Sequence, residues 1–321
     1  MTWQPGASLD SLKTRANILR QIRRFFDDRD VLEVETPLLT SAGVTDPHLV
    51  NFKTQYLLPG EKQGKTLFLQ TSPEFAMKRL LCADTGSIYQ ICKAFRNEEQ
   101  GQCHNPEFTI LEWYRTGFNH WQLMDEVEKL VSLILATKPF ERLSYQAAFQ
   151  TYLDFDPLND SDHNLRQLCR SAGFAEFATP EHSRDTLLQL LFSHKIEPQI
   201  GQSTPCFVYH FPASQAALAK ISPDNPQVAE RFELYFKGVE LANGFHELQS
   251  KQEQAQRFEQ DNQLRQQLAI APAQIDHKFL AALEHGLPEC AGVAMGLDRL
   301  LMLASNTSHI DKVLGFSVDR V

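Results

Sequence analysis

Apolar residues recur at three- and four-residue spacing near the start of the chain, which is the period of an amphipathic helix. The residues that carry this pattern are Leu9, Leu12, Ala16, Leu19, Ile22 and Phe26. Ser8 is the predicted N-cap, and the helix is expected to end near Asp30. Leu32 and Val34 then alternate with glutamates before Pro37, which predicts a half-exposed strand.

Strand-like and helix-like runs are interspersed along the rest of the chain. Strands are predicted at residues 67–70, 87–95, 107–114, 206–211, 232–236, 239–245 and 292–295. Helices are predicted at residues 73–82, 121–136, 184–194, 249–268 and 273–285. Because several strands follow one another without an intervening helix, the pattern favours an α+β fold with an antiparallel sheet flanked by helices. We expect a single domain, residues 1–321, with a helical insertion at about 138–197.

Composition and charge narrow the class of protein. The 321 residues are 42% hydrophobic and 22% charged, which is ordinary for a globular protein with a sizeable core. The net charge of -9 disfavours a general nucleic-acid-binding surface. The six cysteines include no CxxC pair, and no secretory or spanning apolar segment precedes the first helix, so a reducing cytoplasm is expected. The few residues before that helix predict no separate N-terminal domain.

The first candidate site is FRNEEQGQCHNPEFTILEWYR (residues 95–115), where a polar break separates two strand-like runs. Period-two alternation puts Phe108, Ile110, Glu112 and Tyr114 on one face of the second strand. A glutamate on a buried face needs a cationic partner, because an unpaired buried charge is costly. The alternative is a strand face exposed to solvent, and this stretch alone leaves both interpretations open.

Two adjoining segments form the second candidate site. In ELANGFHELQ (residues 240–249), Asn243, Phe245 and Glu247 share a strand face. Just upstream, Glu233 lies across a predicted turn from the first glutamate of that segment, which could bring the two carboxylates together on adjacent strands. Neighbouring carboxylates repel unless a cation joins them, and magnesium bridged to phosphates takes such ligands. A plain surface hairpin is the alternative.

The third candidate site is AGVAMGLDRLLMLA (residues 291–304). Gly292 and Gly296 straddle a short apolar strand that runs into a helix with Arg299 in its first turn. Helix N-terminal amides and a guanidinium both suit phosphate oxygens, so the pattern favours an anion site. A structural helix with an ordinary cap is the alternative.

Taken in order, these segments resemble the three signature motifs of class II aminoacyl-tRNA synthetases, most closely the lysyl-tRNA synthetase catalytic domain. The first motif corresponds to residues 9–30 with VLEVETPLL, the second to FRNEEQGQCHNPEFTILEWY and the third to GVAMGLDRLLML. TSPEFAMKRLL and ELANGFHELQ match the family's substrate-binding segments. The resemblance covers essentially the whole chain. It implies the class II catalytic fold, ATP and Mg²⁺ as cofactors, and a homodimer built through the first motif.

The resemblance also implies a role for individual residues. Arg96 and Arg299 are the implied catalytic residues: Arg96 would contact the substrate carboxylate and the ATP α-phosphate, and Arg299 would cover the adenine that lies on Phe108. The implied ATP-binding residues are Arg96, Asn97, Glu98, His104, Asn105, Phe108, Glu240, Leu241, Gly296 and Arg299. The implied lysine-binding residues are Ser72, Pro73, Glu74, Glu112, Tyr114, Asn243, Phe245, Glu247 and Ala294. Glu233 and Glu240 are the implied magnesium ligands.

Two features depart from lysyl-tRNA synthetases. The anticodon-reading domain that precedes their catalytic helix is not expected here, and Ala294 stands where their third motif usually has glycine. The extra methyl group disfavours the ordinary α-amino acid by about 1–3 kcal/mol. In both departures, the chain resembles a group of stand-alone paralogues that activate (R)-β-lysine. By this resemblance, the protein is an ATP-dependent ligase that joins (R)-β-lysine, or lysine, through an amide bond to a lysine ε-amino group of translation elongation factor P.

Three other functions stay open at this point. A minimal lysyl-tRNA synthetase would require tRNA, whereas a ligase acting on a free metabolite would turn over without a macromolecular acceptor. A non-catalytic regulatory paralogue would have no chemical reason to retain the phosphate and metal contacts.

A basic cluster on the first helix is either a solvated face or a docking face for the acceptor. It comprises Arg15, Arg20, Arg23, Arg24 and Arg29.

Overall fold

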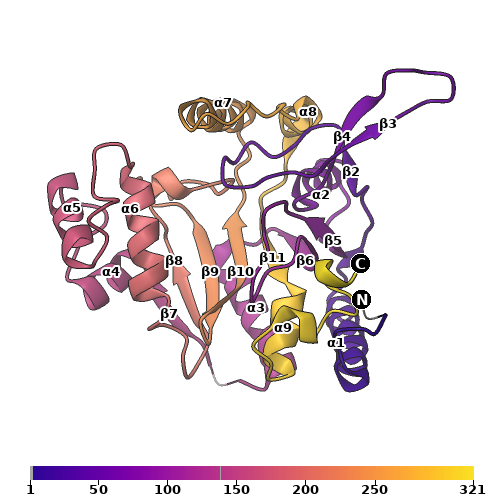
Figure 1. Ribbon diagram of the computed structural model, residues 1–321, viewed down its shortest axis with the longest axis horizontal. Helices are drawn as coiled ribbons and strands as arrows, with labels where there is room; N and C mark the ends of the chain where they lie inside the picture. Colours follow the sequence, from indigo (N-terminus) through magenta and orange to yellow (C-terminus); the bar gives the residue numbers. More distant parts are fainter. Residues whose placement is uncertain (1–2, 138) are drawn as a thin grey trace. The chain divides into compact units, whose positions relative to one another are not determined.

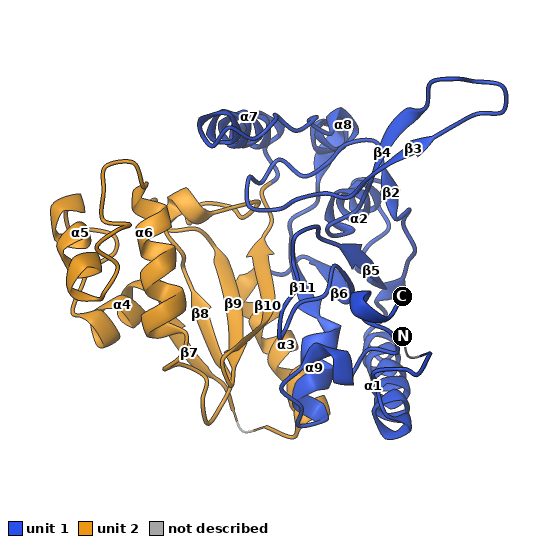
Figure 2. Cartoon of the chain, viewed as in Figure 1, with its two compact units in different colours: residues 1–118, 249–321 blue, residues 119–248 orange. Residues whose placement is uncertain are grey.

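The structure, a computed structural model, describes residues 3–137 and 139–321 (Figure 1). The chain forms two compact units, residues 1–118 with 249–321 and residues 119–248 (Figure 2). Each unit combines helices with a mostly antiparallel set of strands, which confirms the predicted α+β class. A single domain with a helical insertion stays a prediction, and position 138, where that insertion was expected to begin, lies outside the described residues.

The first unit has two sheets and five α-helices among its described residues. The helices are α1 (Leu9–Asp27), α2 (Glu74–Leu81), α7 (Lys251–Gln267), α8 (His277–Gly286) and α9 (Leu297–Ala304). The main strands pair in the order β1 (Leu32–Glu33), β5 (Ile88–Phe95), β6 (Glu107–Thr116) and β11 (Cys290–Gly296). Only the β1–β5 pair among these is parallel. The antiparallel second sheet has the order β2 (Leu39–Thr40), β4 (Lys65–Leu69) and β3 (Lys53–Tyr56). The 3-10 turns η3 (Ile310–Lys312) and η4 (Val318–Arg320) follow.

Helix α1 begins where the sequence predicted. The Ser8 side chain accepts a hydrogen bond from the Ser11 backbone N–H at 3.1 Å, which satisfies one of the free amides of the first turn. The buried face carries Ile18, Ile22, Phe25 and Phe26. The start of the predicted apolar stripe is exposed instead: Leu9, Leu12 and Ala16 all face solvent. Half of the stripe is therefore exposed rather than packed in the core of its unit.

The second unit has four α-helices and four strands among its described residues. Its helices are α3 (His120–Leu135), α4 (Tyr145–Leu153), α5 (Asp162–Ser171) and α6 (Arg184–Leu191). The π-helical turn η1 (Phe192–Ile196) continues α6, and η2 (Ala213–Gln215) is a 3-10 turn. The strands pair in the order β10 (Val239–His246), β9 (Arg231–Phe236), β8 (Cys206–Tyr209) and β7 (Glu141–Ser144). Only the β7–β8 pair among them is parallel.

A hydrophobic core joins the helices of residues 145–196 to this sheet. Tyr145, Phe149, Phe192 and Phe211 are buried within it. The Tyr145 and Phe192 rings stack at 5.3 Å between centroids. The helices α4, α5 and α6 gather beside β7 and β8 (Figure 1). This packing explains why residues 145–196 carry a helical pattern without evident chemical motifs: their apolar positions form a core.

Most predicted elements are confirmed, with two kinds of difference. Helix α8 begins at His277 rather than at residue 273, because the Asp276 side chain caps it by accepting hydrogen bonds from the Lys278 and Phe279 amides at 2.9 and 3.0 Å. The strands β2, β3 and β7 were not predicted. They span at most four residues and are largely exposed, so they carry little apolar alternation. Among the described helices, none is both long and apolar enough to cross a membrane.

Candidate active site

Glu112 lies in the middle of β6, 2% exposed, with both carboxylate oxygens hydrogen-bonded. Ser72 Oγ donates to Oε2 at 2.7 Å, and Tyr114 Oη donates to Oε1 at 2.6 Å. Ala294 of β11 is its cross-strand neighbour. Directly opposed residues have Cβ atoms about 4.5–5.5 Å apart, so the methyl group of Ala294 lies beside the Glu112 side chain. Four predicted lysine-binding residues thus lie together in the first unit.

Glu74, in the first turn of α2, adds a second carboxylate to this group. Its Oε1 accepts from Lys78 Nζ at 2.7 Å, and the Lys78 side chain is 1% exposed. Burial and, to a smaller extent, the charge of Glu74 together raise the pKa of Glu112 to about 7, against the lowering effect of the Tyr114 and Ser72 hydrogen bonds. The two carboxylates, one buried and one partly buried, thus exceed the cationic charge that Lys78 supplies. An incoming ammonium group would relieve that imbalance.

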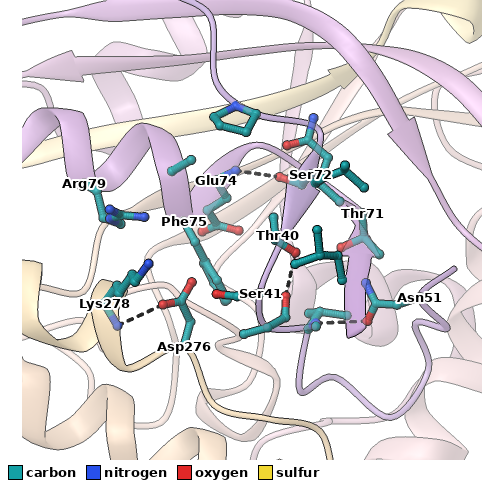
Figure 3. Close-up of a pocket in the computed structure, with 18 residues that line it drawn as sticks. Thr40, Ser41, Asn51, Thr71, Ser72, Glu74, Phe75, Arg79, Asp276 and Lys278 are labelled. Atoms are coloured by element: carbon teal, nitrogen blue, oxygen red, sulfur yellow. Dashed lines mark hydrogen bonds between the residues drawn. The ribbon is translucent and has the colours of Figure 1, made fainter. Parts of the chain in front are cut away.

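A cavity of about 310 Å³ opens beside Ser72 and Glu74 (Figure 3). This volume lies at the lower end of small-molecule sites. Its lining also includes Arg79 of α2, Lys278 of α8 and Asn51, which the sequence analysis did not identify. These side chains come from segments far apart in the sequence, and of the three only Arg79 lies in a segment that the family resemblance had marked. No local signal could have grouped them.

The loop between β5 and β6 holds Arg96 over an aromatic ring. The Arg96 amide donates to the Pro106 carbonyl at 2.9 Å, which closes the loop. Its guanidinium carbon lies 5.1 Å from the Phe108 ring centroid, and Nη1 lies 3.6 Å from Glu99. The Arg96 Nε is buried without a hydrogen-bond partner among the described residues. A guanidinium with an unused buried donor is suited to an oxyanion such as a carboxylate or phosphate.

Other predicted ATP-binding residues of this loop have structural contacts. The Asn97 amide donates to the Val50 carbonyl at 2.8 Å, and Glu98 adopts a left-handed backbone with φ 67°. Asn105 is buried, donates to the Glu107 carbonyl at 2.6 Å and accepts from the Val318 amide at 3.0 Å. Asn105 therefore fixes the C-terminal residues against the start of β6. The assignment of these side chains to ATP stays a prediction.

Arg299 lies in the first turn of α9, directly after Gly296, as the sequence predicted. Its Nη2 lies 2.6 Å from His104 Nε2. A guanidinium can only donate, so His104 Nε2 must be the acceptor. Burial lowers the pKa of His104, and the neighbouring Arg299 charge lowers it further, which favours the neutral imidazole that this contact requires. In the first unit, the predicted arginine and histidine of the nucleotide site are therefore in direct contact.

In the second unit, β9 and β10 form the predicted hairpin. Lys237 and Gly238, with φ of 51° and 71°, make the turn, and two positive φ values are typical of the type I′ turn of tight hairpins. Glu240 pairs with Tyr235, and Asn243 pairs with Glu233. Residues directly opposite share a face, so both glutamates and Asn243 lie on one face of the hairpin.

A β-bulge explains how Glu240 and Asn243 can share a face. Glu240 and Asn243 are three residues apart, so they would lie on opposite faces of a regular strand. The register shifts between Glu240 and Ala242, which leaves Leu241 as the extra residue. The sequence analysis assigned Glu240 and Asn243 to one site by family resemblance. It did not predict the irregularity that allows it.

Glu233 has two close partners on its own strand. Arg231 Nη2 and Tyr235 Oη both donate to its carboxylate. Burial raises the pKa of Tyr235 well above its ordinary value, and the charges of Glu233 and Glu240 add to this effect. Two carboxylates on one hairpin face suit a magnesium ion that keeps its other ligands from water and phosphate. This donor set fits the predicted ion, although Arg231 competes with it for Glu233.

Three further predicted lysine-binding residues continue this face, whereas Pro73 lies in the first unit, just before α2. Arg231 Nε donates to Asn243 Oδ1 at 3.3 Å, and its guanidinium lies 6.0 Å from the Phe245 ring centroid. Phe245 packs against a small cluster of buried alanines. Glu247 is 1% exposed. The structure therefore groups Asn243 and Phe245 around Arg231, a residue that the sequence analysis did not assign to the site.

The basic cluster of α1 is divided among contacts within the first unit. Arg15 Nη1 lies 2.6 Å from Asp298, and Arg23 Nε lies 3.1 Å from Glu33. Arg29 donates to a backbone carbonyl one turn earlier at 2.8 Å. At least three of the five arginines thus stabilise their own unit, and a docking role for the cluster stays a prediction.

These motifs occur together in one known family. The family model for tRNA synthetases class II (D, K and N) matches residues 4–320, and the chain belongs to this family. Its relatives include proteins named elongation factor P--(R)-beta-lysine ligase. The protein of Vibrio atlanticus (strain LGP32) is 57% identical over 319 residues, 99% of both chains. That of Vibrio cholerae serotype O1 is 58% identical over 318 residues, 99% of this chain and 98% of the relative. That of Klebsiella pneumoniae (strain 342) is 53% identical over 319 residues, which is 99% of this chain and 98% of the relative.

Proposed function

We propose that this protein is an ATP-dependent ligase that attaches (R)-β-lysine, or lysine, to the ε-amino group of a lysine of translation elongation factor P. The observation that carries this proposal is the full-length similarity, at 53–58% identity, to proteins named for that reaction. The buried carboxylate of Glu112, with the partly buried one of Glu74, supports it from within the molecule. Glu112 and Glu74 create a demand for positive charge that a substrate ammonium group satisfies.

Activation of the amino acid is the first half of the reaction. A carboxylate oxygen of the amino acid attacks the α-phosphorus of ATP, the bond to the β-phosphate oxygen breaks, and pyrophosphate leaves with that bonding pair. Arg96 binds both reacting oxyanions through its guanidinium, and Arg299 covers the adenine opposite Phe108. Catalysis at this step is positioning and neutralisation of charge, and it requires no protein nucleophile.

Magnesium is part of this proposal. Glu233 and Glu240 are the residues that hold it, and the donor set of the β9–β10 hairpin supports this assignment. When bound, the ion neutralises charge on the phosphate oxygens. Arg231, which contacts Glu233, and Tyr235 orient that carboxylate.

Transfer to the acceptor is the second half. The neutral ε-amine of the acceptor lysine attacks the carbonyl carbon of the adenylate, AMP leaves, and the attacking nitrogen loses a proton as the amide forms. The acceptor is a translation factor, so the reaction takes place in the cytoplasm. A homodimer through the first motif completes the proposal.

The test is intact-mass spectrometry of purified elongation factor P after incubation with this protein, ATP and Mg²⁺. (R)-β-lysine and α-lysine are supplied in separate reactions, and bulk tRNA replaces the factor in a parallel set. A mass gain of one lysyl group on the factor, faster with the β isomer, is expected. An Arg96→Ala variant is the negative control.

The same assay separates the competing functions. Charged tRNA with an unmodified factor would identify a minimal lysyl-tRNA synthetase and overturn the proposal. Continuous AMP release in the absence of any macromolecular acceptor would indicate a ligase acting on free metabolites. No ATP–pyrophosphate exchange with either amino acid would indicate a non-catalytic paralogue.

A further inference from the structure

A histidine-rich cluster in the second unit lies outside the residues assigned to the proposed reaction. His120 is the first residue of α3, Glu230 directly precedes β9, and His246 is the last residue of β10. One potential ligand atom from each lies within 4.8 Å of the others. The exposed fractions of the three side chains are 3%, 12% and 9%. Two imidazoles and a carboxylate thus converge in a largely water-free position.

The backbone holds this cluster in place. The His246 amide donates to the Glu230 carbonyl at 2.9 Å, and the His246 carbonyl accepts from the Lys220 amide at 2.8 Å. Asn119 caps α3 in a reciprocal arrangement with Gln122, with both hydrogen bonds at 3.0 Å. The three side chains therefore project from fixed ends of regular elements, which is the support that a ligand site needs.

Glu230 and His246 are already paired, whereas His120 is not. His246 Nδ1 contacts Glu230 Oε2, and His120 Nδ1 lies 4.0 Å from the same oxygen. Both ring nitrogens of His120 are buried without a hydrogen-bond partner among the described residues. Leaving a buried polar group unsatisfied costs about 1–3 kcal/mol, so two such atoms in one ring require an explanation.

Two rings pack against His120. Trp121 and His210 lie 4.6 and 5.3 Å from its ring, centroid to centroid. Burial lowers the pKa of His120 to about 4, so the imidazole is neutral and has a free lone pair. Burial acts to raise the pKa of Glu230, but the hydrogen bond from His246 and the neighbouring positive charges together lower it, which favours the ionised carboxylate. These are the protonation states in which both groups bind metals.

We infer that His120, Glu230 and His246 form a binding site for a divalent transition-metal ion of the zinc class. Two imidazoles and one carboxylate with an open fourth position suit zinc, whereas magnesium prefers oxygen ligands. Bonds of about 2.0–2.2 Å in a tetrahedral site place ligand atoms about 3.3–3.6 Å apart. To reach this spacing, the His120 side chain must move closer to Glu230, and the direct contact between His246 Nδ1 and Glu230 Oε2 must open as the ion replaces the shared proton. The ring of His210 is the nearest further imidazole.

Such an ion would clamp the start of α3 to the ends of β9 and β10. These two strands carry Glu233, Glu240 and Asn243, so the clamp stabilises the hairpin without touching the reacting atoms. The inference goes beyond the proposed function and does not depend on it. Metal content and thermal stability test it without any activity measurement.

The experiment uses the full-length protein without a polyhistidine tag, stripped with a chelator and then dialysed. Zn²⁺ is titrated by equilibrium dialysis with elemental analysis, and Co²⁺ is titrated as a visible-absorption probe. We expect one ion per chain, a tetrahedral Co²⁺ spectrum, and a higher Tm with zinc, because an ion that binds only the folded state stabilises it. Mg²⁺ at the same concentration should produce no such rise.

The variants His120→Gln and Glu230→Gln each remove one ligand and retain a polar side chain. We expect their affinity for zinc to fall by more than about tenfold. His163→Gln is the matched control, since this histidine is exposed on α5 of the same unit, and it should bind as the wild type does. Circular dichroism establishes that each variant is folded.

Cysteines are the main competing ligands, and the Co²⁺ spectrum separates them from the cluster. Thiolate ligands give an intense near-ultraviolet charge-transfer band that imidazole and carboxylate ligands lack. Absence of stoichiometric binding to the wild type, a thiolate band, or unchanged zinc affinity in both ligand variants would each overturn the inference. If the variants fail to fold, the wild-type Co²⁺ spectrum and stoichiometry still decide it.

Discussion

Glu112 is the residue whose environment is most sharply defined. It is buried, accepts hydrogen bonds from Ser72 and Tyr114, and lies near the charge of Glu74. We expect Glu112→Gln to lower kcat/KM for (R)-β-lysine by about 30- to 150-fold in ATP–pyrophosphate exchange, because a hydrogen bond to a charged group contributes about 2–3 kcal/mol. The matched control is Glu107→Gln, an exposed glutamate on the same strand, which should retain wild-type kinetics. Equal losses in both variants would remove Glu112 from the lysine site.

The pH dependence of lysine binding follows from the same carboxylate. The pKa of Glu112 is raised from 4.5 to about 7 in the ligand-free pocket, chiefly by burial. Only the ionised form attracts an ammonium group, so kcat/KM for the amino acid should rise as pH increases through about 7. In Glu112→Gln this rise should disappear. Kinetics that are flat between pH 6 and 8 in the wild type would contradict the assignment.

The stability of the ligand-free protein should change with pH in the direction opposite to kcat/KM: it should fall as pH rises. A carboxyl group whose pKa is raised in the folded state contributes stability below its unfolded value of 4.5, and that contribution is lost as pH rises through about 7. Without ligand, the Tm of Glu112→Gln relative to the wild type should therefore be higher at pH 8 than at pH 5. Differential scanning calorimetry at the two pH values measures this. Saturating (R)-β-lysine should narrow the difference at pH 8 by stabilising the wild type.

Ala294 tests the origin of substrate preference. Its methyl group lies across from Glu112 on the neighbouring strand, at the base of the predicted lysine site. We expect Ala294→Gly to shift the ratio of kcat/KM values towards α-lysine by about 10- to 200-fold, the range for one methyl group in a pocket. Exchange assays with both isomers measure the ratio. An unchanged ratio would mean that this methyl group does not determine the preference.

Sequence reasoning predicted residue types at this scale better than residue environments. The family pattern identified Glu112, Tyr114 and Arg299, and the structure brings the first two into contact. It did not identify Arg231, because an arginine beside a glutamate on a strand carries no motif of its own. Neither could it predict the buried contacts of Asn105, since one of its partners lies at position 318 and is adjacent only after folding.

At the scale of elements, local signals predicted strands and turns, whereas register depended on tertiary pairing. The Lys237-Gly238 turn could be predicted from the sequence, since glycine favours positive φ. The bulge at Leu241 could not be predicted, because nothing in the local alternation marks one additional residue. The exposed start of the α1 stripe shows the same limit. Periodicity predicts an apolar face, but it does not say what covers that face.

The β9–β10 hairpin gives the prediction at this scale. Glu240→Gln removes one charge from a face that also carries Glu233. We expect the Mg²⁺ concentration for half-maximal adenylate formation to rise by about tenfold or more, since a carboxylate ligand binds this hard cation better than an amide does. Pyrophosphate exchange titrated with Mg²⁺ measures it. The control Glu141→Gln removes an exposed glutamate from β7 and should leave the titration unchanged.

At the scale of the whole molecule, the predicted site residues divide between the two compact units. The first contains Arg96, Glu112 and Arg299, and the second contains Glu233 and Glu240. Family resemblance predicted both sets because the motifs are recognised along the sequence, whichever unit their residues belong to. The second unit's core was not predicted, since apolar packing can be built from many sequences.

The predicted homodimer is the last expectation to test, and the exposed apolar residues of the first unit are where we expect its interface. Leu9, Leu12 and Leu32 are 67%, 36% and 55% exposed, and β1 is an edge strand within its unit. An unpaired strand edge beside exposed leucines is a surface that proteins usually cover. We expect the wild type to have twice the chain mass in light scattering, and Leu32→Asp to be monomeric because a buried carboxylate at the interface is costly. The control Leu133→Asp changes a leucine on α3 that is also 55% exposed, and it should remain dimeric. If both variants keep the wild-type mass, the interface lies elsewhere.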